Sequence, residues 1–511
     1  MQKLKQILKV IFIIPFSIGN PDAQSSNATD GSVSAAILFS CLVSIILVVV
    51  GTFSGLHRFN ETSMKVIWGL IATLVTIATI NILLIFSRIH GRQNPITSMK
   101  DDRDASSQLQ LKFLWLFGLG LILRTSLTIA TNVDCFAKGG SQVVDVASAI
   151  SSFVMIVFIL LVIGLITFMK KRVFLRVSWI YFSIGAVLLA NASVWLNFAT
   201  VGIFGILHQS VYNNVSTNYT IRNNTFNYCF LHSEIRLFST EIQPYLFQIS
   251  LDFLLLATLF IVKTLPALQD PDINRSVRNV HEEIRSNILN HRRTGIVSIV
   301  IGIILHIPFF VMALVIRFVF LGNLNILREI WQIGVIVQKS VMLLIILAAF
   351  SHMGERSSDP CAWKFSSSDC ILLTCCGGKI VVHTFEILVT TANRVLLCKG
   401  ILNLVFYFYH TLYILVSRRS VQAALMQSRV SIFVHVLLFT LNITQWTTTA
   451  FVLSVEGNYV LNEGVEGLFP NPVVWKVLQY IIIPFTLYYD FQSAMHFYGI
   501  LPNFRFETKA F

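Results

Sequence analysis

The chain has 511 residues, of which 55% are hydrophobic and 12% are charged, and its mean hydropathy is +0.72. So little polar surface cannot coat a water-soluble globule, which excludes the soluble enzymes and predicts an all-α, polytopic membrane protein. The formal net charge of +13 is carried by Lys and Arg dispersed over short links, which is typical of loops facing anionic lipid and unlike a nucleic-acid-binding surface.

The N-terminal segment, residues 1–32, has the features of a secretory signal. Lys3 and Lys5 precede a short apolar run, and small residues follow near Ala23, but Lys9 interrupts the apolar core. Two interpretations stay open, a cleaved leader and a cytosolic amphipathic segment, and the charge bias of the later links favours the second.

Twelve apolar runs are each long enough to cross the hydrocarbon of a bilayer. Their approximate bounds are residues 33–54, 64–87, 112–132, 142–169, 175–203, 242–264, 295–320, 330–352, 371–393, 395–416, 430–454 and 473–498. The division after residue 393 depends only on Arg394, Lys399 and Gly400. We expect about twelve transmembrane helices in two six-helix halves.

The expected domains follow from these runs. The N-terminal half covers 33–264, a cytosolic linker covers 265–294, the C-terminal half covers 295–498, and a cytosolic C-terminus covers 499–511. Lys and Arg gather in alternate links, which predicts that both termini are cytosolic.

The outer links carry further signals. The 204–241 link has sequons for glycosylation, as an extracytoplasmic loop can, at Asn214, Asn218 and Asn223. Cys135 and Cys229 also fall on outer links, where they form either a disulfide or two free thiols.

A polar pattern, Asn-x-Ser/Thr-x-Trp, interrupts two apolar runs, at Asn191–Trp195 and at Asn442–Trp446. On a helix the Asn and the Trp share a face, and the Ser or Thr can bond to its own backbone. An asparagine side chain in the hydrocarbon of a membrane needs a hydrogen-bond partner, because no water is there to supply one. The recurrence indicates an internal duplication, which often places the working site of a transport protein within or between its halves, and the alternative is chance repetition.

Charged groups inside the spans are candidates for function because they are costly at membrane depth. Asp252 lies near the middle of its span, where a carboxyl group can exchange protons. The alternative is a structural carboxylate paired with Arg124. Asp490 is likewise either a functional acid or a structural carboxylate. Its expected partners are basic residues of the cytosolic links, such as Arg418 or Arg419.

Other polar residues have weaker signals. His410 can relay a proton through its two ring nitrogens or serve as a hydrogen-bonded packing residue. Internal ion pairs are the expected role of a further set, Glu386 with His383, Lys339, His306 and Arg317. No nucleotide-binding glycine loop, HExxH or GxSxG motif is present, so we expect neither an enzyme nor a cofactor.

Six short motifs follow one another along the spans: Phe113–Gly120, Ala190–Trp195, Asp252–Phe253, His410–Leu415 with Ser417–Arg419, Asn442–Trp446 and Pro484–Ser493. In this order they resemble the otopetrin family of proton channels over nearly the whole chain. The resemblance implies a proton-selective channel of the plasma membrane, opened by extracellular acid. It also implies a homodimer whose six-span halves form a pseudo-fourfold assembly, with protons and membrane lipid as partners.

The chain departs from the family at four positions. Asp252 replaces a Glu, His410 replaces a Gln, and Asp490 and Gln492 stand where the family has Arg and His. Asp490 and Gln492 lie about 200° apart on a helix, which predicts that only one of them faces the interior. We expect Gln492 to face it and Asp490 to serve as a structural or gating anchor.

The leading hypothesis is therefore a channel in which Asp252 exchanges protons and water passes the notches at Asn191 and Asn442. Its other candidate residues are Arg124, Glu386, His410, Asp490 and Gln492. A proton-coupled secondary transporter would use the same acid to move a small solute. An intramembrane acyl- or glycosyl-transferase would need a catalytic His or Asp near the inner face and a lipid or nucleotide-sugar pocket, and the sequence has no pattern of that kind.

Overall fold

The computed structural model describes eleven helical stretches and two short strands. The described residues are 61–90, 96–99, 105–137, 142–170, 172–174, 180, 182–195, 198, 234–264, 292–318, 324–353, 367–389, 394–420, 429–450 and 472–500. The N-terminal segment, the first expected span, the three sequons and Cys229 lie outside them. So do the side chains of Cys135, Arg317, Arg418 and Arg419.

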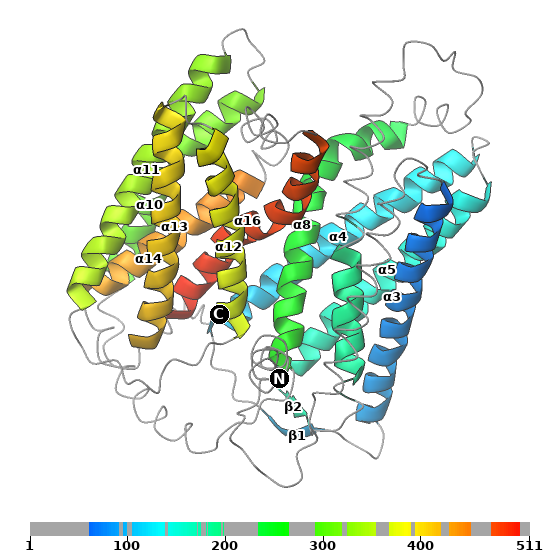
Figure 1. Cartoon of the computed structure of the whole chain (residues 1–511). Helices are drawn as coiled ribbons and strands as arrows, with labels where there is room; N and C mark the ends of the chain where they lie inside the picture. The colour runs from blue at the N-terminus through cyan, green and yellow to red at the C-terminus, as the bar shows by residue number, and fades with distance from the viewer. Residues whose placement is uncertain are drawn as a thin grey trace, which may run out of the picture. The chain divides into compact units, whose positions relative to one another are not determined.

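Two compact units divide the chain. The first is Met1–Asp102 with Leu111–Gln269, and the second is Arg103–Gln110 with Asp270–Phe511. The described helices of the first unit are α3 (Glu61–His90), most of α4 (Ala105–Ala137), α5 (Gln142–Met169), the short helix Phe182–Trp195 and α8 (Glu234–Thr264) (Figure 1). The first turns of α4, up to Gln110, belong to the second unit. Helix α5 packs against α3 and α8.

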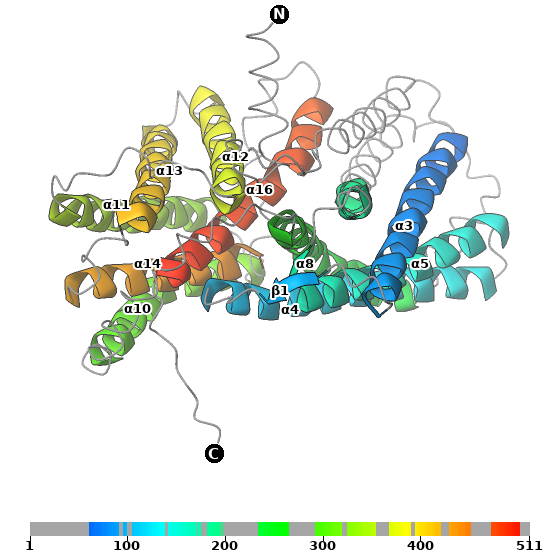
Figure 2. The same ribbon diagram turned by 90° about the horizontal axis from the view of Figure 1, so that it is seen from below.

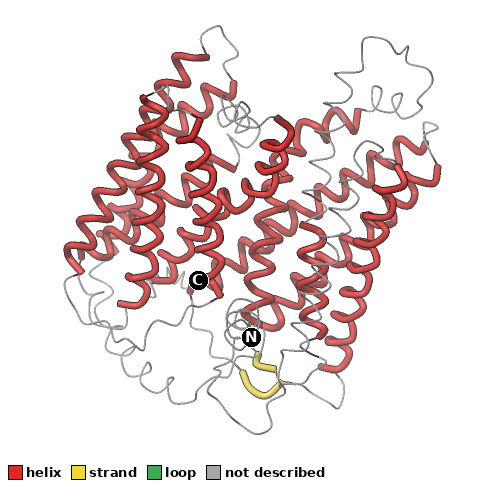
Figure 3. The backbone as a smooth tube through the Cα atoms, viewed as in Figure 1, coloured by secondary structure: helices red, strands yellow, loops and turns green. Residues whose placement is uncertain are grey.

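A small two-stranded ribbon joins two links of the first unit. Strand β1 (Ile96–Met99) pairs antiparallel with β2 (Arg172–Phe174), with Ile96 opposite Phe174 and Met99 opposite Arg172. The ribbon is yellow in Figure 3, where every other described element is a helix. The all-α prediction therefore holds for the spans and misses this short pairing between links.

In the part of the second unit that the structure describes, there are six long helices. They are α10 (Arg292–Phe318), α11 (Leu324–Met353), α12 (Ser367–Val389), α13 (Arg394–Ser420), α14 (Arg429–Thr448) and α16 (Pro472–Ile500). Helix α16 packs against both α14 and α12, and α13 packs against α11 and α12 (Figure 2). Polar side chains carried by these six helices therefore meet inside the unit.

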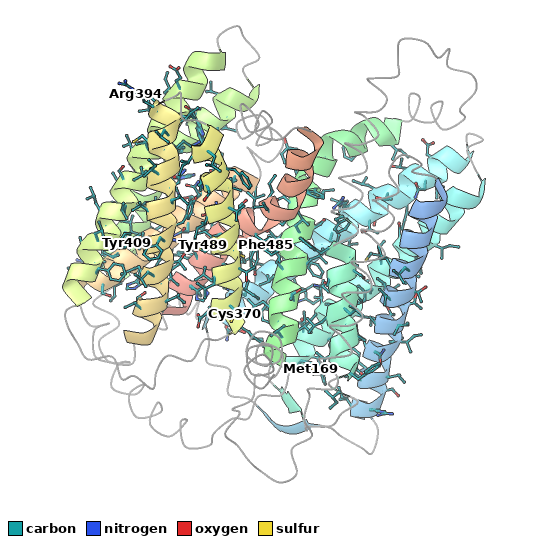
Figure 4. The ribbon with its side chains drawn as sticks, in the orientation of Figure 1. Met169, Cys370, Arg394, Tyr409, Phe485 and Tyr489 are labelled. Atoms are coloured by element: carbon teal, nitrogen blue, oxygen red, sulfur yellow. The ribbon has the colours of Figure 1, made fainter. Side chains whose placement is uncertain are left out.

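Nine helices of the described part are long and apolar enough to cross a membrane, so the chain has the character of a membrane-spanning protein. A helix needs no outside partner for its backbone hydrogen bonds, which is why apolar runs of this length become helices in lipid. The weakest expected boundary is confirmed, because α12 ends at Val389 and α13 begins at Arg394. In Figure 4, Arg394 marks that end of the helix pair and Cys370 lies near the opposite end of α12.

A close contact holds α10 against α14 at Gly302. A Cβ atom added there would lie 2.9 Å from Cβ and Cγ2 of Thr440, whose Oγ1 donates a hydrogen bond of 2.9 Å to the Val436 carbonyl. The Thr440 side chain cannot easily move away, because its Cβ is fixed to the backbone and its hydroxyl group is hydrogen-bonded. We therefore expect Gly302→Ala to lower the free energy of unfolding by about 1–3 kcal/mol, measured as a lower Tm in detergent.

The matched control is Gly164→Ala in α5, where an added Cβ would meet nothing within 4 Å. It should leave Tm unchanged or raise it slightly, since alanine favours the helix. A Gly302→Ala protein that unfolds at the wild-type Tm would mean that α10 and α14 can separate without cost.

Candidate functional site

Asp252 is fully buried in the first unit, at 0% exposure on α8. One helical turn earlier, Gln248 Nε2 donates a hydrogen bond of 3.2 Å to Asp252 Oδ1. The amide donates, and the carboxyl oxygen accepts. A deeply buried carboxyl group with an amide partner is thus present where the sequence predicts the exchangeable acid.

Asn191 joins the short helix Phe182–Trp195 to α8. Its Nδ2 donates to the Leu254 carbonyl and to Thr258 Oγ1, both at 2.8 Å, so both amide hydrogens are used. Its Oδ1 is buried and has no hydrogen-bond partner among the described residues. Ser193 Oγ donates 2.7 Å back to the Ala190 carbonyl, which confirms the expected local bond.

Asn191 and Asp252 meet different faces of α8. Thr258 lies six residues beyond Asp252, which is about 240° round the helix. Asn191 therefore ties the short helix to α8 on a face separate from that of Asp252.

Arg124 lies over two neighbouring aromatic rings. Its guanidinium carbon lies 4.2 Å from the Phe198 ring centroid and 4.9 Å from that of Phe247. Cation–π attraction to both rings stabilises the charged guanidinium group in apolar surroundings. The aromatic contacts, which the sequence interpretation did not anticipate, fix its position.

The second unit contains a hydrogen-bonded chain that begins at Asn442 on α14. Asn442 Nδ2 donates to the Leu438 carbonyl at 2.7 Å and lies 3.3 Å from His410 Nε2 on α13. The carbonyl can only accept, so the amide orientation is fixed and His410 Nε2 must also accept. His410 is therefore a neutral imidazole that carries its proton on Nδ1.

The chain continues across two further helices. His410 Nδ1 lies 2.8 Å from Tyr489 Oη on α16, which lies 2.7 Å from Thr411 Oγ1. Thr411 in turn donates to Cys376 Sγ on α12 at 3.2 Å. With His410 donating at Nδ1, the only consistent order is that Tyr489 donates to Thr411. Figure 4 labels Tyr489 in the interior of this unit.

This chain, from His410 through Tyr489 and Thr411 to Cys376, is called the relay below. Each of its members can both donate and accept a hydrogen, which is the requirement for passing a proton by reorientation. All four are buried, with His410 at 0% exposure. The second notch asparagine thus sets the direction of the relay, a role that its counterpart Asn191 does not share.

Asp490 forms a buried ion pair with a residue of α12. Its Oδ2 lies 3.0 Å from Lys379 Nζ, and the two side chains are 1% and 10% exposed. Its other oxygen, Oδ1, has no hydrogen-bond partner among the described residues. The side chains of the expected partners, Arg418 and Arg419, lie outside the described residues. The described partner is a lysine inside the membrane span, and the pair ties α16 to α12.

Gln492 is also buried, at 0% exposure. Its Nε2 donates 2.8 Å to Ser368 Oγ on α12 and lies 3.3 Å from His496 Nε2. The expectation that only one of Asp490 and Gln492 faces the interior is wrong. Both are buried, and both bond to residues of α12, Asp490 to Lys379 and Gln492 to Ser368.

Glu386 is the centre of a third polar group. Its two oxygens accept from Lys399 Nζ and His383 Nδ1, each at 2.7 Å, and Asn403 Nδ2 lies 3.4 Å from that same ring nitrogen. Glu386 and Lys399 are 9% exposed at the side chain. The expected pairing of Glu386 with His383 is present, and Lys399 completes the charge balance.

His306 on α10 belongs to a separate contact. Its Nε2 lies 2.7 Å from Thr448 Oγ1, which itself donates to the Thr444 carbonyl, so His306 donates at Nε2. Gln338 Nε2 lies 3.3 Å from His306 Nδ1. His306 is thus a neutral hydrogen-bonded residue and not the ion-pair member that the sequence suggests.

Tyr407 lies between these groups. Its ring stacks on His383 with centroids 5.3 Å apart, meets Tyr489 edge-on at 5.3 Å, and faces Lys379 Nζ at 5.0 Å. Its carbonyl lies 3.8 Å from Cys376 Sγ, the end of the relay. One aromatic residue therefore contacts the Glu386 group, the ion pair and the relay.

Several members of the site were missed at the sequence level, namely Lys379, Tyr489, Thr411, Cys376 and Tyr407. Lys379 had a usable signal, because a lysine in the middle of an apolar run is as costly there as Asp252. Its neighbour Gly378 lets α16 approach, since an added Cβ would lie 3.0 Å from Phe485 Cβ. The hydroxyl groups of Tyr489 and Thr411 gave no such signal in the sequence, because a hydroxyl group costs little in an apolar run and its hydrogen-bond partner depends on the fold.

Among groups of His, Cys, Asp and Glu in the described residues, none has the arrangement to hold a metal ion. Comparison with known protein families and with curated proteins finds no match for this chain.

Proposed function

We propose that the chain is a proton-selective channel of the plasma membrane that admits protons when the outside becomes acidic. The relay carries the proposal, because it is a buried series of exchangeable hydrogens that joins three helices without an intervening apolar gap. Asp252, buried in the first unit, is the second candidate carrier.

The resemblance to the otopetrins supplies the rest of the proposal. It implies a homodimer whose two six-helix halves per subunit form a pseudo-fourfold assembly. The apolar runs add twelve spans, and the Lys and Arg bias of the links adds cytosolic termini. The nine apolar helices support a multi-span topology of this kind. The hydrogen-bonded asparagines support the internal repeat, since each links its own helix to another helix of its unit.

Whole-cell recording during external acidification tests the function directly. A channel should give a current whose reversal potential follows the proton gradient with no added solute. Replacing external sodium and chloride should leave that reversal potential in place. A reversal potential that follows either ion instead would contradict proton selectivity.

Asp252→Asn should remove most of the acid-evoked current, because the amide keeps the shape and the Gln248 contact but cannot exchange a proton. Asp252→Glu should retain the current, since it keeps the carboxylate on a longer arm. Surface biotinylation would establish that both variants reach the membrane. Full current in the Asn variant would remove Asp252 from the pathway.

A proton-coupled secondary transporter is the alternative. The buried Lys379–Asp490 pair favours it, because exchangeable charge pairs within spans are used for coupling in transporters. Such a protein would show a proton current only when its solute is added. Acid-evoked current in a solute-free solution therefore separates the two proposals.

A further inference from the structure

Lys339 on α11 is buried at 3% exposure in the second unit. Its ammonium lies over two ring faces, 4.4 Å from the Phe406 centroid and 5.2 Å from the Tyr407 centroid. Among the described residues it has no hydrogen-bond acceptor and no carboxylate within ion-pair distance. The rings hold the charge in place by cation–π attraction, but they leave its three N–H donors unused.

The charges around Lys339 do not balance. Among the described residues, Lys379 and Asp490 are the charged side chains that act on it, and they already form an ion pair with each other. The nearby histidines, His306 and His410, are neutral by their hydrogen bonds. Two ammonium groups thus face one carboxylate, which leaves one positive charge in excess.

The other buried carboxylates of α12 do not remove this excess. Glu386 is bound by Lys399 and His383. Asp369 precedes Lys379 by ten residues, which is about 15 Å along the helix. An isolated charge in apolar surroundings is costly, so it calls for a counter-charge beside it.

We propose that a small inorganic anion of the size of chloride binds beside Lys339, between its ammonium and that of Lys379. The anion would accept the unused N–H donors of Lys339 and bring the net charge of the group to zero. A small monovalent anion is the class we propose, because one positive charge is in excess and Lys339, Lys379 and Asp490 are all buried. This site does not depend on conduction and goes beyond the proposed function.

Thermal unfolding of the full chain in detergent tests the site at fixed pH and ionic strength. We expect the wild-type Tm to be a few degrees higher in sodium chloride than in sodium gluconate, because an ion that binds only the folded state stabilises it. Lys339→Met should remove this difference and should itself unfold no earlier than wild type in gluconate, since it removes an uncompensated charge.

Lys263→Met is the matched control. Lys263 lies in the other unit and also faces a ring, that of Phe260 at 5.9 Å. This variant should keep the full chloride effect. A wild-type protein with equal Tm in the two salts would overturn the proposal, as would an undiminished chloride effect in Lys339→Met. The first result would also be expected if Lys339 were neutral or moved to pair with Asp490 Oδ1.

Crystals grown in bromide provide a measurement that needs no variant. The anomalous signal should place a bromide beside Lys339 Nζ. Bromide found only on the protein surface would overturn the site independently of any effect on Tm.

Discussion

Asp490→Asn should lower the free energy of unfolding by about 3–5 kcal/mol, which is the cost of leaving a buried charge without its partner. The change removes the carboxylate that Lys379 contacts at 3.0 Å and leaves two buried ammonium groups together. We expect a large fall in Tm and in the amount of protein at the cell surface, measured in detergent extracts and by surface biotinylation.

The double variant Asp490→Asn with Lys379→Met is the control for this prediction. It removes both members of the pair, so the side chains of the group return to the single excess positive charge that they carry in the wild type. Most of the lost stability should therefore return. If Asp490→Asn alone unfolds at the wild-type Tm, the ion pair does not hold α12 to α16.

His410→Phe should reduce the proton current by about a hundredfold or more, the usual contribution of a positioned proton-transfer group. The ring stacks against Phe406 with centroids 5.1 Å apart, so phenylalanine preserves the packing. It removes both nitrogens that join Asn442 to Tyr489. Current at a fixed proton gradient, normalised to surface protein, measures the loss.

Tyr409→Phe is the matched control, because Tyr409 is the adjacent residue and is 37% exposed, outside the relay. It should conduct like the wild type. Wild-type proton current in His410→Phe would assign the pathway to the other unit, where Asp252 is the remaining candidate.

Much of the fold could be predicted from the sequence because membrane spans depend on length and hydropathy. Each described span lies within a few residues of an expected one, and the division at Arg394 is correct. The local bonds of Ser193 and Thr444 to their own helices were also predictable, since they depend only on spacing along one helix.

The partners across helices could not be predicted in this way. Helical periodicity gives the face of a residue, but the rotation of each helix and the reach of its neighbours decide what that face meets. Asp490 illustrates the difference, because helical periodicity gives no sign that Lys379 reaches it from α12. Asn191 and Asn442 have one pattern and nonetheless bond differently, to a backbone and a hydroxyl in one case and to an imidazole in the other.

The position of Tyr407 makes the three polar groups of the second unit thermodynamically coupled. Its ring touches His383, Lys379 and Tyr489, so a shift in any of them changes the packing and the local field felt by the other two. Residues that share a partner have interaction energies and do not add. The free-energy changes of substitutions at Glu386, Lys379 and His410 therefore belong to one cooperative system, and the effect of each substitution depends on the state of the others.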